Sequence, residues 1–131
     1  MRIIEEMARI IAEAFGLVER GRIEEAEQSL EETLFSLTGI MPAHIIHSDP
    51  HQFAAWLSED RKFSPEWLEA LADLCIARAD LAAESDDETE RAWWGVAQAL
   101  LERANALETH TLSLPRMQKL KLIASNLEAH V

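Results

Sequence analysis

The stretch Ala14-Phe15-Gly16-Leu17-Val18-Glu19-Arg20-Gly21-Arg22-Ile23-Glu24-Glu25-Ala26 decides the fold, because it joins two amphipathic helices through one glycine. Before it, apolar residues recur at the three- and four-residue spacing of one helical face, which predicts a helix over residues 2–19. Gly21 follows where a helix needs a left-handed terminating residue. After it, Glu24 and Glu25 lie in a first helical turn, where acidic groups complement the helix dipole. The pattern therefore predicts a helical hairpin over residues 1–38.

Residues 39–63 break this periodicity and are expected to form an irregular connection. Gly39, Pro42 and Pro50 interrupt the helical pattern. A single helical turn around residues 43–47 is the alternative to irregular backbone there. Pro50 follows Ser48 and Asp49, the order expected of an N-cap and a first helical position, so one short helix is predicted after it.

Residues 64–131 carry the signals of a second helical hairpin and a C-terminal helix. Ser64 before Pro65 predicts a helix that ends near residue 83, and Ser85 with Glu88 fits a capping box that begins the next. A last helix is expected to begin near Pro115. Alternating β-branched runs are almost absent, so no sheet is predicted. We expect one all-α domain over residues 1–131, built of antiparallel helical hairpins with five or six helices.

The first hairpin resembles a tetratricopeptide repeat. The resemblance lies in the spacing of Ala14, Leu17, Gly21, Ile23, Ala26 and Leu30 and covers about 34 residues, the repeat length of that family. It departs at Ile10, where the family has tryptophan, and at Phe15. An offset of 66 residues, near two repeat lengths, relates residues 17, 26, 30 and 33 to residues 83, 92, 96 and 99. Two ordinary antiparallel helices in a bundle are the alternative for that second pair. The whole-chain layout also resembles an uncharacterised bacterial family of unknown function, which implies no activity.

The composition limits the classes of partner. The chain has 24 acidic and 12 basic residues, a formal net charge of −12, which repels nucleic acids and anionic membranes and favours a basic protein or peptide. The single cysteine cannot form an internal disulfide, and Glu5 and Glu6 interrupt the apolar N-terminal stretch. No apolar run reaches the roughly 20 residues that a membrane span needs. A cytoplasmic protein is expected.

Three histidines form the sharpest candidate for chemistry. His44, His47 and His51 lie with Asp49 within eight residues, and imidazole and carboxylate groups bind divalent metals. Pro50 opposes one continuous helix through all three histidines, and neither a cysteine pair nor an HExxH motif accompanies them. A polar connection with a helix cap is the favoured interpretation. No cofactor, catalytic residue or metal site is therefore assigned.

Two neighbouring tryptophans are the candidate partner-binding residues. Trp93 and Trp94 point about 100° apart on a helix, so both cannot occupy the centre of one narrow apolar stripe, and a partly exposed tryptophan there could anchor a partner. A broad core face that buries both is the favoured interpretation. Cys75 lies among apolar residues and is interpreted as a core thiol with a raised pKa.

These observations favour a non-catalytic interaction or scaffold protein that binds a protein or peptide through uncovered apolar surface or through the groove between helical pairs. The alternative is a metal-dependent helical enzyme that uses His44, His47 and His51. Stacked hairpins leave terminal faces open, so we expect a homodimer to cover one face, unless the last helix does so. Two lysines and an arginine of that helix, Arg116, Lys119 and Lys121, are placed near the acidic face of residues 22–38.

Overall fold

The computed structural model of the chain describes residues 2–85, 87–110 and 112–129, and within these ranges the backbone forms seven helices and no strand. The predicted all-helical class is confirmed. In chain order the helices are α1 (Arg2–Glu19), α2 (Ile23–Thr38), α3 (Pro42–His47), α4 (Pro50–Glu59), α5 (Pro65–Glu84), α6 (Glu90–Leu107) and α7 (Leu114–Glu128).

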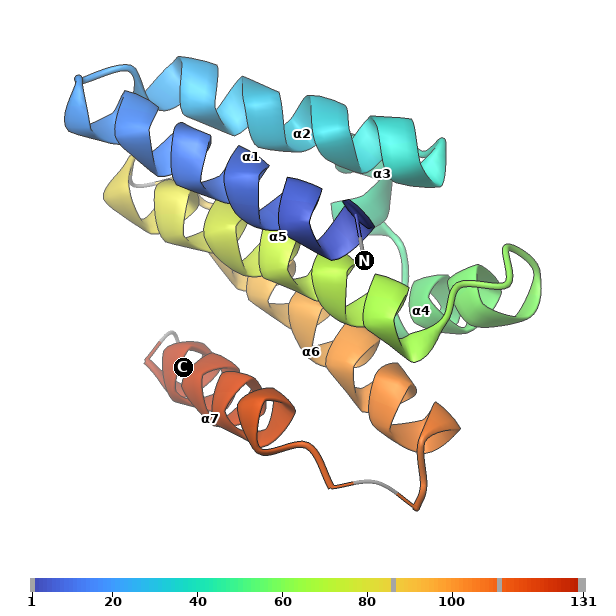
Figure 1. Cartoon of the computed structure of the whole chain (residues 1–131). Coiled ribbons are helices and arrows are strands. Elements are labelled where there is room, and N and C mark those ends of the chain that lie inside the picture. Colours follow the sequence, from blue (N-terminus) through green and yellow to red (C-terminus); the bar gives the residue numbers. More distant parts are fainter. Residues whose placement is uncertain (1, 86, 111, 130–131) are drawn as a thin grey trace.

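The first hairpin closes at Gly21 as its sequence predicts. Gly21 has a φ of 77°, a left-handed conformation that glycine adopts without strain. The Arg22 N–H donates to the Leu17 carbonyl at 2.8 Å, and the Gly21 N–H donates to the Val18 carbonyl at 2.9 Å. This is the Schellman pattern, which satisfies the last carbonyls of α1 and reverses the chain. As a result α1 and α2 lie antiparallel and side by side (Figure 1).

The connection between the hairpins is more regular than predicted. It contains two helices, α3 and α4, so the expectation of five or six helices is wrong for the described residues. Pro42 and Pro50 each occupy the first turn of a helix. Proline fixes φ at a helical value there and lacks only an N–H that the helix does not use, so both prolines begin helices. Asp49 caps α4 by accepting from the N–H groups of His51 and Gln52.

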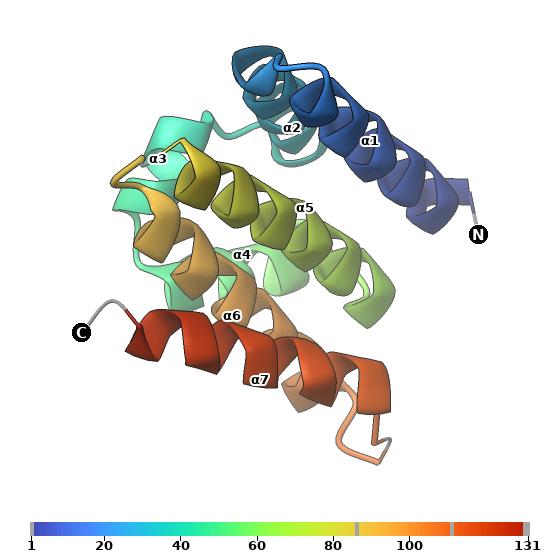
Figure 2. The same ribbon diagram turned by 90° about the vertical axis from the view of Figure 1, so that its left-hand side faces the viewer.

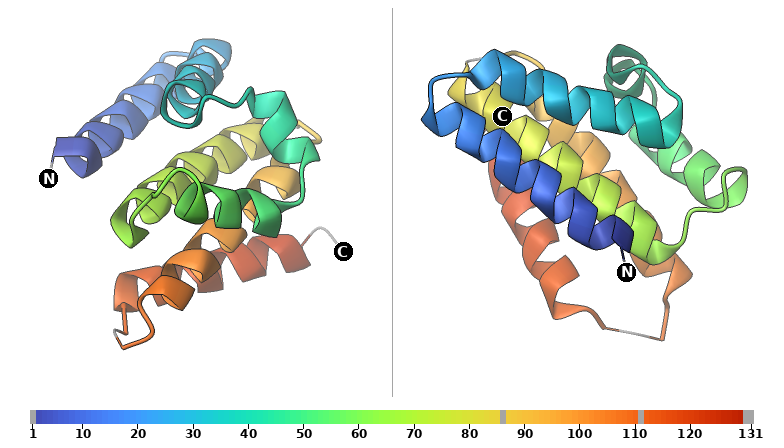
Figure 3. Two further views of the ribbon diagram at one scale, coloured as in Figure 1. Left: turned by 90° about the vertical axis from the view of Figure 1, so that its right-hand side faces the viewer. Right: turned by 45° about the horizontal axis from the view of Figure 1, so that its top comes forward.

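The helices form layers around the central hairpin of α5 and α6. In Figure 2, α1 and α2 cover α5 on one side of this hairpin, and α7 lies against α6 on the other. α4 also packs on α6 (Figure 3, left). α1 and α5 run side by side in the same direction (Figure 1; Figure 3, right). This arrangement leaves one flank of each exposed in the same face of the protein.

The beginning of α6 differs from the prediction. Ser85 is not its N-cap but the C-cap of α5, where its N–H donates to the Leu81 carbonyl. α6 begins four residues later than a Ser85 cap would place it, after Thr89, whose side chain makes no capping bond. The Thr89 N–H instead donates to the Asp87 carboxylate at 2.9 Å. That bond and the nearby Arg78 lower the pKa of Asp87 by more than burial raises it, so the pKa lies below its usual value.

Two buried arginines connect the layers. Arg78 of α5 donates to Glu31 and Glu27 of α2 and to Asp87 of the α5–α6 turn, at 2.8, 3.2 and 3.2 Å. Its guanidinium also lies 5.7 Å from the Trp93 ring centroid. Such paired burial is the condition under which a charge can leave water. We call Arg78 and its three carboxylates the Arg78 cluster.

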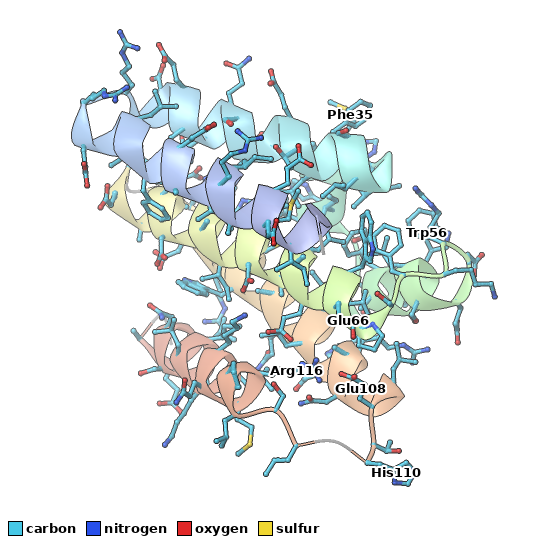
Figure 4. All side chains as sticks on the ribbon, in the orientation of Figure 1. Phe35, Trp56, Glu66, Glu108, His110 and Arg116 are labelled. Carbon is cyan, nitrogen blue, oxygen red and sulfur yellow. The ribbon has the colours of Figure 1, made fainter. Side chains whose placement is uncertain are left out.

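The second buried arginine, Arg116, attaches α7. It donates to Glu69 of α5, Asn105 of α6 and Glu108, as Figure 4 shows for the side chains of Arg116 and Glu108. Arg116 and Lys119 thus meet acids of α5 and the end of α6, and not the acidic face of α2 as expected from the sequence. Charge alone could not distinguish these faces, because both carry carboxylates.

Candidate interaction groove

An open groove of about 400 Å³ runs between α1 and α5. We call it the α1–α5 groove. Its wall from α1 is apolar and consists of Ile4, Met7, Ala8, Ile11, Ala12 and Phe15. Its wall from α5 consists of Ala70, Asp73, Ile76, Ala77 and Asp80. The groove therefore has an apolar surface with two carboxylates along one side.

The groove exists because α1 carries more apolar surface than its neighbours cover. Met7 and Ala14 are buried in the core. Ile4, one turn before Met7, stays 41% exposed, and Ala8 and Ala12 are also exposed. The apolar face of α1 is wide enough to contact both α2 and α5, and the edge of that face remains in water.

The groove continues toward the N-terminal end of α5. A second hollow of about 180 Å³ shares Ile4, Ala70 and Asp73 with the first, and Glu66, Glu69 and Lys119 complete its lining. In Figure 4 the Glu66 side chain lies near the start of α5. Four acids of α5 line the two hollows: Glu66, Glu69, Asp73 and Asp80. Residues three, four and seven apart share one helical face, so these acids form a continuous stripe.

One part of this stripe already holds a cation. The Lys119 ammonium of α7 lies 2.8 Å from Glu69 and 2.9 Å from Asp73. Burial raises the pKa of Glu69, but bonds from Lys119 and Arg116 outweigh it, so that pKa is lowered. For Asp73 burial is the larger effect, and its pKa is raised despite Lys119. The ammonium is itself desolvated, yet its two carboxylate partners raise the pKa of Lys119.

Asp80 lies farther along the same stripe in a different electrostatic environment. Within the described residues it makes no ion pair with a lysine, arginine or histidine. Partial burial raises the pKa of Asp80, and the negative charges of Glu90 and Glu84 raise it further. A carboxylate that is partly desolvated and surrounded by like charge is stabilised by an incoming cation.

The structure does not expose the predicted tryptophan anchors. Trp93 and Trp94 are each 1% exposed, which agrees with the broad core face and not with an exposed anchor, and neither ring offers a surface to a partner. The helix that carries both side chains, α6, contacts α3, α4, α5 and α7. Trp94 Nε1 donates to Glu90 at 3.0 Å, whereas Trp93 Nε1 is buried and has no hydrogen-bond partner among the described residues.

The three histidines of the candidate metal site are not brought together. His44, His47 and His51 are exposed, and no group of three or more metal-binding side chains forms within residues 2–85, 87–110 and 112–129. His47 Nδ1 lies 2.6 Å from the Ala43 carbonyl, and Asp49 caps α4. His51 lies 3.9 Å from Glu102 of α6. The segment forms α3 and the start of α4, in agreement with its interpretation as a polar connection with a helix cap.

Cys75 lies where its sequence context places it. It is 1% exposed within the core, and burial, with a contribution from Asp73, raises the pKa of its thiol far above the usual range. A thiol in this state is a poor nucleophile at neutral pH.

Comparisons with protein-family models, with curated proteins and with solved structures find no match for this chain. The tetratricopeptide resemblance and the resemblance to an uncharacterised bacterial family therefore remain predictions. In the described part of the chain, none of the helices combines the length and the apolar character needed to cross a bilayer.

The sequence predicted a groove between the helical pairs but did not show that α1 and α5 line it. One signal was available: Asp73 and Asp80 interrupt the apolar pattern of residues 65–84 seven residues apart, which places them on one face of a helix. That signal does not reveal which other helix lies beside this face.

Proposed function

We propose that this protein is a non-catalytic interaction module that holds a polypeptide segment of a partner protein in the α1–α5 groove. The observation that carries this proposal is the exposed apolar wall of α1 beside the carboxylates of α5. Exposed apolar surface arranged as a groove with a few polar groups is typical of binding sites. The formal charge of −12 favours a basic partner, because opposite charge increases the rate of encounter.

A random-peptide display library tests the proposal without knowledge of the natural partner. Peptides selected on the full chain are measured by fluorescence anisotropy against two variants. Ala8→Trp places an indole in the groove, since Ala8 is exposed and lines it. Ala106→Trp adds the same side chain to an exposed position of α6 outside it. Both sites face water, so neither substitution disturbs the core.

We expect Ala8→Trp to weaken peptide binding by about tenfold, equivalent to about 1.4 kcal/mol, while Ala106→Trp changes it by less than about twofold. A library that yields no binder, or binders with equal affinity for both variants, would overturn the proposal.

A homodimer remains part of the proposed function. The exposed apolar side chains Leu114, Met117 and Leu122 lie on α7, the last helix of the stack, and a second copy that covered them would bury apolar surface. Light scattering on the purified chain measures the oligomeric state. A mass of one chain at all accessible concentrations would exclude the dimer.

A further inference from the structure

We propose that the segment bound in the α1–α5 groove is a short amphipathic helix whose lysine or arginine pairs with Asp80. This inference rests on the proposed function and adds to it the conformation and the charge of the partner segment. Three features of the groove support it: an internal cation on one part of the acidic stripe, the surroundings of Asp80, and the length and lining of the groove.

The contact of Lys119 shows how the stripe accommodates a cation. Its ammonium lies between Glu69 and Asp73 and contacts both within 2.9 Å. Asp80 follows Asp73 by seven residues, which is about two helical turns or 10.5 Å along α5. No lysine or arginine of the described chain pairs with Asp80, so the second position on the stripe is open to a cation from outside.

Neighbouring acids make Asp80 a better cation site than an isolated surface carboxylate. Glu84, one turn farther along α5, and Glu90, at the start of α6, both add negative potential at Asp80. A guanidinium or ammonium beside Asp80 would interact favourably with all three carboxylates. The adjacent apolar wall would accommodate the aliphatic stem of the same side chain.

The groove favours a helical occupant over an extended one. From Ile4 to Phe15 its α1 wall spans twelve residues, or about 16 Å at the rise of an α-helix, which matches three turns of a bound helix. Both walls are helices, so the groove presents no strand edge with which an extended segment could pair its backbone groups. A helix satisfies its own backbone and needs only an apolar face.

The protein already contains an example of this packing. α5 lies in contact with both helices of the α1–α2 hairpin. A partner helix placed between α1 and α5 would repeat this arrangement on the open face in front of them (Figure 1). Its contacts with Ile4, Ile11 and Phe15 would come from apolar residues spaced three, four and seven apart.

Peptides from the library selection provide the test, with Asp80→Asn as the main variant and Glu24→Gln as its charge-matched control. Both substitutions remove one negative charge, but Glu24 is exposed on α2, outside the groove. We expect the selected peptides to share one lysine or arginine at a constant spacing from their apolar residues. Asp80→Asn should lower the affinity of these peptides by about tenfold and Glu24→Gln by less than about twofold, since only Asp80 pairs directly with their lysine or arginine.

Charge reversal and helix disruption complete the test. Selection on Asp80→Lys should enrich peptides with aspartate or glutamate at the position where the original peptides carry a cation. Proline at a central position of a selected peptide should abolish binding if the peptide binds as a helix. This inference would be refuted by peptides that bind Asp80→Asn with unchanged affinity, or by peptides that tolerate the central proline. If the same peptides lose affinity for Ala8→Trp, the proposed function stands. Peptides insensitive to Ala8→Trp would refute the proposed function itself.

Discussion

Removal of the Arg78 guanidinium tests whether buried charge holds the α1–α2 hairpin on the rest of the protein. The side chain of Arg78 is 7% exposed and bonds Glu27, Glu31 and Asp87, whose side chains are 17%, 36% and 27% exposed. Arg78→Met retains an unbranched stem of similar length and leaves three carboxylates without their cation. Loss of one member of a buried ion pair costs about 3 to 5 kcal/mol. Because the carboxylates reach water, we expect the lower end, about 3 kcal/mol.

Urea denaturation followed by circular dichroism at 222 nm measures this loss. For a chain of this length it corresponds to a fall in Tm of about 10 °C. Arg78→Lys should be intermediate, because one ammonium cannot reproduce the planar fork that bonds three carboxylates. Arg9→Met is the control, since Arg9 is 58% exposed and its ion pairs within the described residues are with Glu6 and Glu13 of its own helix. A loss below about 1 kcal/mol for Arg78→Met would refute the reasoning, because the Arg78 cluster would then contribute no more than a surface pair.

Three further predictions concern the hairpin turn, the core thiol and acid stability. Gly21→Ala should lower the free energy of unfolding by about 1 to 2 kcal/mol, because a φ of 77° strains any residue with a Cβ. Gly16→Ala should raise it by about 0.5 to 1 kcal/mol, since alanine favours the helix and its Cβ meets no atom within 4 Å. Chemical denaturation of the two variants measures both changes. The thiol of Cys75 should not react with Ellman's reagent in the native protein and should react fully in denaturant, because burial raises its pKa; rapid labelling of the folded chain would contradict this. The pKa of Glu69 is lowered on folding, so this residue stabilises the protein at pH above its usual value of 4.5 and loses that contribution as the pH falls through the folded value. Glu69→Gln should thus lower stability at neutral pH and flatten the acid side of the stability profile, and a profile unchanged from that of Glu24→Gln would count against the role of Glu69.

Local features of the fold were predictable from the sequence. The bounds of α1 and the reversal at Gly21 depend on apolar spacing and on one backbone conformation, both of which are properties of a short segment. The beginnings of α4, α5 and α7 were predictable because a capping side chain precedes a proline there. In α4 and α5 the capping residue directly precedes the proline, and in α7 one residue separates the two. The beginning of α6 was not predictable in this way, because Ser85 is equally suited to end one helix and to begin the next.

Features that depend on the number of neighbours were not predictable. The position of Trp93 and Trp94 on one helix is clear from the sequence, but their burial depends on which elements pack against α6, and α6 contacts four other helices. The carboxylate partner of Arg116 could not be predicted either, because α2 and α5 both present carboxylates. Arg116 bonds Glu69 because α7 packs close to that residue of α5.

The sequence by itself determined that the chain is helical, where most helices begin and end, and that its charge is strongly negative, because each of these depends on neighbouring residues or on composition. Only the tertiary structure decided that the margin of the α1 stripe stays in water beside Asp73 and Asp80. The physical reason is that exposure is a property of packing between segments far apart in the chain. Periodicity shows which side of a helix is apolar, but not how much of that side its neighbours cover.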